Sequence, residues 1–217
     1  MKKIMIALLV LGNIYIANAQ NEDSDGKNKV AVSGALTSCD TWQMEASYHY
    51  MICPYIGLGA SIGMWKQYAV NGVPKGQGWK IDENYEETEN FYLRPSIHLV
   101  SPPVVRFSEN WLGFFMEPGF MMNIPYCNVP VNLLDGQGHK IGFKKVSSNN
   151  GRWYAFDCKI GLNLNLGGIG ISGGYLYSNL DIFALRRNMI FEGRRFDEFY
   201  PVKRHLHGGF LTVYYIF

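Results

Sequence analysis

The feature that most constrains the fold is a strict alternation of apolar and polar residues over residues 153–166. Every even position from Tyr154 to Leu166 is apolar, whereas the odd positions include Asp157, Lys159, glycine and asparagine. Successive side chains of a β-strand point to opposite faces, so this pattern predicts a strand with one apolar and one polar face. A helix repeats about every 3.6 residues and would not produce it.

Seven further segments show the same alternation, so the sequence predicts eight strands. Each has about the 9–11 residues that a tilted strand needs to cross a bilayer. Aromatic residues reach 15% and charged residues only 18%, a balance that suits strands facing lipid better than a soluble enzyme. The seven segments are residues 29–37, 42–51, 56–68, 91–100, 111–122, 169–180 and the last segment, ending at Phe217.

The lengths of the connections predict an antiparallel up-and-down barrel. Three alternate links are short (residues 52–55, 101–110 and 167–168), and three are long (residues 69–90, 123–152 and 181–205). Short turns on one side and long loops on the other are the usual asymmetry of membrane barrels. The first link, residues 38–41, is short where a long loop is expected.

The fifth link leaves an alternative strand count open. Residues 130–134 and 139–146 flank Asp135-Gly136-Gln137-Gly138, which predicts a hairpin. We expect this hairpin to extend above the membrane, which keeps the count at eight. If it lay in the barrel wall, the count would be ten.

The N-terminus predicts export. Lys2 and Lys3 precede the apolar residues 4–16, and Ala17-Asn18-Ala19 is typical of a cleavage site, so residues 1–19 are interpreted as a signal peptide. Residues 20–28 are interpreted as a flexible polar leader and residues 29–217 as the barrel. Beyond the signal peptide no apolar run approaches the roughly 20 residues of a membrane helix. A membrane-spanning structure would then have to be a closed barrel.

The last strand carries a family resemblance. Leu211, Val213, Tyr215 and Phe217 alternate up to the terminal residue, although Gly209 departs from the pattern. With the strand count and loop asymmetry, the chain resembles small outer-membrane barrels of the OmpA/OmpX kind, particularly the porin-family β-barrel domain proteins of Bacteroidetes. The resemblance implies a Gram-negative outer membrane, with the lipid bilayer and lipopolysaccharide as partners. It also implies that the barrel-assembly machinery recognises this terminal strand.

The polar faces of the strands gather a set of ionisable residues that would point into the lumen. We expect a structural role, because an eight-stranded interior is only wide enough to be filled by side chains, and charges there need partners. Acid–base catalysis by a histidine and a carboxylate remains the alternative. The set is Glu45, His49, Arg94, His98, Glu117, Asp157 and Lys159.

The long links hold further candidates. Arg186, Arg187, Arg194 and Arg195 make the seventh link basic and could contact lipopolysaccharide phosphates. A Cys39–Cys127 disulfide is possible in an exported chain, since both residues would lie on one side of the membrane.

Two sequence signals for chemistry are weak. A lipid A deacylase would need a histidine next to a serine on a late strand, but Tyr177 precedes Ser178. His205 and His207 form an isolated H-x-H pair, for which a place in the interfacial band is the simpler interpretation.

The sequence therefore predicts a non-enzymatic integral outer-membrane barrel that serves surface interaction, envelope integrity or limited solute passage. It predicts no cofactor and no metal. The net charge of +2 gives no reason to expect nucleic acid as a partner, and the oligomeric state stays open. One alternative is an exported lipocalin-like barrel with its apolar face inward around a small ligand. The other is a lipid A-modifying enzyme.

Overall fold

The computed structural model describes residues 26–67, 73–82 and 88–217 of the 217-residue chain. The predicted signal peptide and residues 20–25 of the predicted leader lie outside the described residues. Within the described part, no helix is long and apolar enough to cross a membrane.

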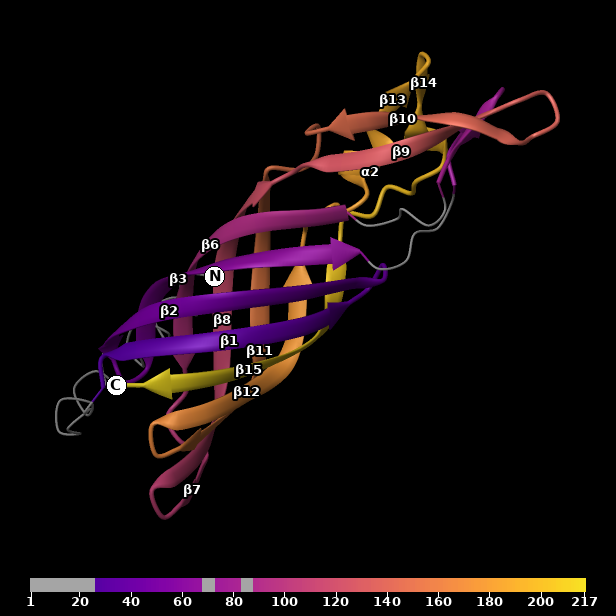
Figure 1. The fold of residues 1–217 in the computed structure, drawn as a ribbon. Helices are drawn as coiled ribbons and strands as arrows, with labels where there is room; N and C mark the ends of the chain where they lie inside the picture. The colour runs from indigo at the N-terminus through magenta and orange to yellow at the C-terminus, as the bar shows by residue number, and fades with distance from the viewer. Residues whose placement is uncertain (1–25, 68–72, 83–87) are drawn as a thin grey trace, which may run out of the picture.

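Eight long strands form one closed antiparallel barrel (Figure 1). Each strand pairs with its neighbours in chain order, β8 pairs with β11, and β15 pairs with β1 to close the ring. The prediction of eight strands is therefore confirmed, with boundaries that shift by a few residues at most. The strands are β1 (Asn28–Thr37), β2 (Thr41–Cys53), β3 (Ile56–Gln67), β6 (Thr88–Val100), β8 (Asn110–Ile124), β11 (Tyr154–Leu166), β12 (Ile169–Ser178) and β15 (Leu206–Ile216).

The links at residues 52–55, 101–110 and 167–168 lie at the end of the barrel where β1 begins and β15 ends. The Asn28 N–H donates to the Phe217 carbonyl at 3.0 Å, and the Phe217 N–H donates back to Asn28 at 2.9 Å. The link after β6 includes β7 (Val105–Phe107), which pairs with the start of β8 and extends below the barrel in Figure 1. The first and last barrel strands, β1 and β15, lie side by side.

The barrel turns its apolar face outward. Neighbouring residues on β3 show this clearly, because Ile62 is 66% exposed and Ser61 is 2% exposed. Exposed large apolar side chains lie on all eight barrel strands, while serine, asparagine and charged side chains are buried inside. A lipocalin-like barrel would have the opposite arrangement, so the structure contradicts that alternative.

The described parts of the three long links fold together at the other end of the barrel into a unit that we call the cap (Figure 1). Its sheet has the order β10–β9–β5–β4 and is separate from the barrel sheet, so the predicted hairpin lies outside the wall. The seventh link adds a second, two-stranded sheet and two short helices. The cap elements are β4 (Lys75–Gly76), β5 (Trp79–Ile81), β9 (Cys127–Leu134), β10 (Lys140–Ser148), α2 (Ala184–Arg187), β13 (Ile190–Phe191), β14 (Arg194–Arg195) and η1 (Phe196–Glu198).

A tight turn forms the tip of the β9–β10 hairpin. The Asp135 carboxylate accepts backbone N–H groups of Gln137 at 2.9 Å and His139 at 2.8 Å. The His139 contact is the main reason that the pKa of Asp135 lies below its usual value, since it favours the charged form. Gly138 adopts a φ of 87°, which favours glycine.

The cap has its own hydrophobic core, which continues into the loop-side end of the barrel. Phe196 and Val131 are fully buried in it, and Trp79 packs against Phe196 at a ring-centroid distance of 5.7 Å. Trp65 and Leu206 reach the same cluster from the barrel strands. The long links are thus not merely solvated loops, because they bury one continuous apolar cluster against the barrel.

Replacing Phe196 with alanine tests whether the cap depends on this core. Phe196→Ala should cost the cap about 3–5 kcal/mol of unfolding free energy, because a buried aromatic ring is replaced by a cavity. Limited proteolysis should then cut residues 179–205 faster than in the wild type, while the barrel still resists unfolding in detergent. Phe107→Ala, at a 48% exposed side chain on β7, is the control. Equal proteolysis of the two variants would contradict the account.

Candidate functional site

All seven predicted lumen residues point into the barrel, where the structure brings them into a single connected group. Each is buried, and the contacts below join them to Lys29 and Tyr92. We call this set the interior network: Lys29, Glu45, His49, Tyr92, Arg94, His98, Glu117, Asp157 and Lys159.

Arg94 on β6 is the centre of the interior network. Its Nε lies 2.8 and 2.7 Å from the two Asp157 oxygens, and its Nη1 donates to Glu117 Oε1 at 2.7 Å. Its Nη2 also donates to the Glu117 backbone carbonyl at 3.0 Å, and Glu45 lies 3.9 Å from Nη1. A guanidinium fits this role because its planar fork presents five donors in fixed directions. Arg94 therefore ties β6 to β8 and β11 from inside.

Glu45 on β2 anchors the other side of the interior network. Its carboxylate pairs with Lys159 and accepts the Tyr92 hydroxyl at 2.9 Å. The Tyr92 oxygen in turn accepts the Gln43 side-chain amide at 2.6 Å. Lys159 reaches from β11 and Glu45 from β2, so this contact spans the lumen.

His98 connects Glu117 to Lys29, which lies near the end of the barrel where β1 begins. Lys29 Nζ lies 2.7 Å from His98 Nε2, and His98 Nδ1 lies 2.9 Å from Glu117 Oε2. With Lys29 taken as an ammonium, which can only donate, Nε2 is assigned as the acceptor and the ring proton is assigned to Nδ1, where it faces a carboxylate. This assignment makes His98 a neutral bridge between Lys29 and Glu117.

The formal charges inside the barrel balance. Three carboxylates (Glu45, Glu117 and Asp157) meet three cations (Lys29, Arg94 and Lys159). The space beside the network is a cavity of about 10 Å³, lined in part by Lys29, His49 and Thr212. A cavity of that size holds about one water molecule.

Glycines on the inner face make room for these large side chains. A Cβ on Gly119 would lie 2.4 Å from Arg94 Nε and 2.6 Å from an Asp157 oxygen. A Cβ on Gly63 would lie 2.3 Å from the Tyr92 hydroxyl. Those contacts are closer than real Cβ atoms allow, so the network requires glycine, which has no Cβ, at both positions.

The arrangement gives little support to catalysis inside the barrel. His49 Nε2 lies 2.9 Å from the Ser96 hydroxyl, a distance suited to a base and a nucleophile. However, Glu117 approaches the same Nε2 at 3.7 Å, and Nδ1, which a triad's third group would orient, is buried with no hydrogen-bond partner. His49 lines the cavity of about 10 Å³, which has no room for a substrate.

Sequence reasoning missed two members of the interior network. Tyr92 lies on the same inner face as Arg94, but an aromatic ring was not expected among lumen charges. Lys29 is the first residue of the predicted strand 29–37, so the alternation indicates its inward direction from one side only. The strand register places Lys29 opposite His49 across β1 and β2, and this pairing identifies Lys29 as an inner residue.

The four arginines predicted to contact lipopolysaccharide do not form one exposed group, and the contact itself stays a prediction. Arg186 is only 3% exposed, because α2 packs it into the cap. Arg187 donates to Asp181 at 2.7 Å and to the Pro201 carbonyl at 3.0 Å. Arg194 and Arg195 lie on the surface, where Arg194 pairs with Glu198.

The histidine and serine candidates of the late strands are engaged elsewhere. The Ser178 hydroxyl donates to the Phe156 carbonyl at 3.2 Å and accepts the Leu180 N–H at 3.2 Å. His205 hydrogen-bonds the Tyr177 hydroxyl at 2.6 Å. His207 stacks on Tyr175, so both histidines lie against outward-facing aromatic rings.

The remaining sequence candidates occupy the barrel strands and the cap. Leu211, Val213, Tyr215 and Phe217 all point outward, and the rings of the last two stack at 5.8 Å. Among the described residues no disulfide forms, so Cys39 and Cys127 carry thiols, and both contact the cap core.

Comparison with known proteins gives a structural likeness only. No family model matches the sequence, and no curated protein was found to be a relative. Among solved structures, Neisserial surface protein A has a TM-score of 0.45 and 11% identity, and the match covers 88% of this chain and 94% of that one. A major outer membrane protein from Thermus thermophilus has a TM-score of 0.46 and 11% identity, over 88% of this chain and 99% of that one.

The outer membrane enzyme PagL is a similar case, with a TM-score of 0.41 and 7% identity over 87% of this chain and 99% of that one. At such low identities and scores, these neighbours carry no conclusion about the function of this chain.

Removing the central cation tests the interior network. Arg94→Leu should lower the unfolding free energy of the barrel by about 3–5 kcal/mol, because it leaves buried carboxylates without their partner. Removing Asp157 as well (Arg94→Leu with Asp157→Leu) should recover part of the loss. Urea unfolding in detergent micelles measures both, with Arg195→Leu on the exposed strand β14 as the control. A wild-type midpoint for Arg94→Leu would contradict the account.

Two glycine variants separate the loss of stability caused by steric overlap in the lumen from the general effect of replacing glycine with alanine in a strand. Gly119→Ala should cost about 1–3 kcal/mol, since the added methyl group overlaps Arg94 and Asp157. Gly34→Ala on β1 should not destabilise the barrel, because nothing lies within 4 Å of its Cβ position. The same urea unfolding measurement compares them. Equal loss in both variants would show that Gly119 is not needed for space.

Proposed function

We propose that this chain is an integral outer-membrane protein of a Gram-negative bacterium, in which a sealed barrel anchors a folded cap at the cell surface. The observation that carries the proposal is the distribution of side chains on the barrel. Apolar residues such as Ile62 and Leu211 cover the outside, and paired charges fill the inside. Water would solvate this apolar outer surface poorly, whereas acyl chains match it.

The proposed task is non-enzymatic surface interaction or envelope integrity. Solute passage is a poor fit, because the salt-bridged network fills the lumen beside a cavity of about 10 Å³. Enzymatic modification of lipid A is also a poor fit, because the Ser178 hydroxyl is bonded to backbone groups. The cap therefore carries the proposed task, since it offers the extended surface outside the barrel.

Three parts of this proposal concern partners and export. Residues 1–19 would direct export, and the outward row that ends at Phe217 would be read by the barrel-assembly machinery. Lipopolysaccharide phosphates would contact Arg195 and, when its pairing with Glu198 opens, Arg194. The exposed position of Arg195 supports this narrower set.

A pair of protease-site insertions tests location and topology together. A site inserted at residues 136–138, at the tip of the β9–β10 hairpin, should be cut by protease added to intact cells. The same site inserted at residues 167–168, between β11 and β12 at the opposite end, should be cut only after the outer membrane is opened. Both proteins should sediment with outer membranes and migrate differently on gels before and after boiling.

The opposite cleavage pattern would reverse the proposed orientation. A wild-type protein that stays in the soluble fraction would contradict the membrane assignment itself. Mass analysis of lipid A from cells with and without the gene tests the enzymatic alternative, and the proposal expects identical spectra.

A further inference from the structure

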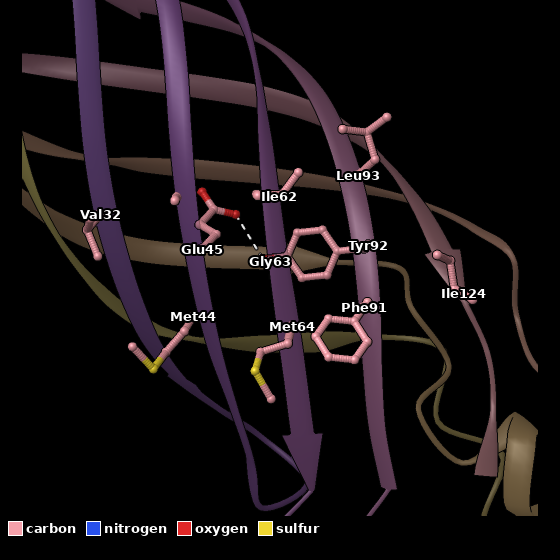
Figure 2. Close-up of a pocket in the computed structure, with 11 residues that line it drawn as sticks. Val32, Met44, Glu45, Ile62, Gly63, Met64, Phe91, Tyr92, Leu93 and Ile124 are labelled. Atoms are coloured by element: carbon pink, nitrogen blue, oxygen red, sulfur yellow. Dashed lines mark hydrogen bonds between the residues drawn. The ribbon is translucent and has the colours of Figure 1, made fainter.

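The outer wall of the barrel has an open apolar recess near the cap end, which we call the groove (Figure 2). Its volume is about 680 Å³, and it crosses β1, β2, β3, β6 and β8. The register shows that it lies along two adjacent outward rows. The row nearer the cap is Met44, Met64, Phe91 and Ile124, and the next row is Val32, Ala46, Ile62 and Leu93.

A small side chain between larger ones contributes to the groove. Ala46 lies directly between Val32 on β1 and Ile62 on β3, so the row has a gap at β2. Figure 2 shows the side chains of Met44, Met64 and Phe91 along the nearer row, while Glu45 and Tyr92 point the other way and join inside the barrel. The groove surface is therefore almost entirely apolar, although a charged pair lies just behind the wall.

The position of the groove fixes its depth in a membrane. One row closer to the cap, Leu36, Trp42 and Lys66 lie opposite one another on β1, β2 and β3. Tryptophan and lysine are typical of the boundary between hydrocarbon and water. The groove therefore lies just beneath the boundary on the cap side, within the hydrocarbon layer.

We propose that this groove is a binding site for one acyl chain of a lipid in the cap-side leaflet, held in a fixed place with its headgroup level with Trp42 and Lys66. The inference rests on the proposed membrane location and adds a specific lipid site to it. Since lipid and protein side chains are equally apolar, the gain comes from close contact and not from hydrophobicity. A chain in the groove touches side chains on its flanks as well as its floor.

Two methionines suit this task. Met44 and Met64 are unbranched and flexible, so they can adapt to the shape of a chain. Met64 is only partly exposed although it faces outward, which fits a residue that lines a recess.

Filling the gap at Ala46 tests the site. The full mature protein, purified in detergent, is titrated with dipalmitoyl phosphatidylglycerol, and bound lipid is counted by native mass spectrometry. The wild type should retain one lipid, and Ala46→Leu should lose about tenfold in occupancy, the size expected from losing on the order of ten atom contacts. Ala60→Leu is the matched control, because it adds the same side chain to the outward face of β3 away from the groove.

Retention of one lipid by the wild type and Ala60→Leu, with loss in Ala46→Leu, supports the site. Equal retention by all three proteins, or none by the wild type, overturns it. A wild-type dimer that Ala46→Leu converts to a monomer would also overturn it, since a second copy would then occupy the groove. Migration before and after boiling is followed for every variant, so failure of the lipid site is distinguished from failure of the membrane assignment.

Discussion

The structure depends on one constraint, which is that a ring of eight strands must satisfy its polar groups inward while it presents an apolar wall. The closed ring pairs the backbone of every barrel strand with neighbours on both sides, so no open edge faces lipid. The side chains face the same demand in the lumen. Arg94 meets it by bonding Asp157 and both the side chain and backbone of Glu117.

This solution fills the barrel interior with paired polar side chains. Three carboxylates and three cations balance, and inner glycines such as Gly119 admit the large side chains that carry them. Buried ion pairs are sensitive to the loss of one partner, so the network favours one register of the strands. Activity at the protein surface then has to come from the wall or from the two ends, where the groove and the cap lie.

Much of the barrel could be predicted from the sequence because a strand repeats every two residues. The alternation around Asp157 and Lys159 indicated both the strand and the face that turns inward. The partners of each lumen charge could not be predicted, because they depend on the register between strands. Lys29 reaches His98 although the two residues belong to strands that are not adjacent in the barrel.

The cap could be predicted only in part, because its apolar residues follow no period. The turn at Asp135 indicated the β9–β10 hairpin correctly. Phe196, in contrast, stands in the long basic link at residues 181–205, and Leu180 ends the predicted strand 169–180. Only tertiary packing brings these two residues into one core. The same packing buries Arg186, which a count of basic residues had assigned to the surface.

The most direct test compares two adjacent positions on β3. In a background without native cysteines, Ile62→Cys and Ser61→Cys are spin-labelled, and their collision rates with oxygen and with a water-soluble nickel complex are measured in lipid bilayers. The account predicts that the label at residue 62 meets oxygen freely and nickel rarely, as in hydrocarbon, and that the label at residue 61 is shielded from both. Free access of nickel to residue 62 would contradict it.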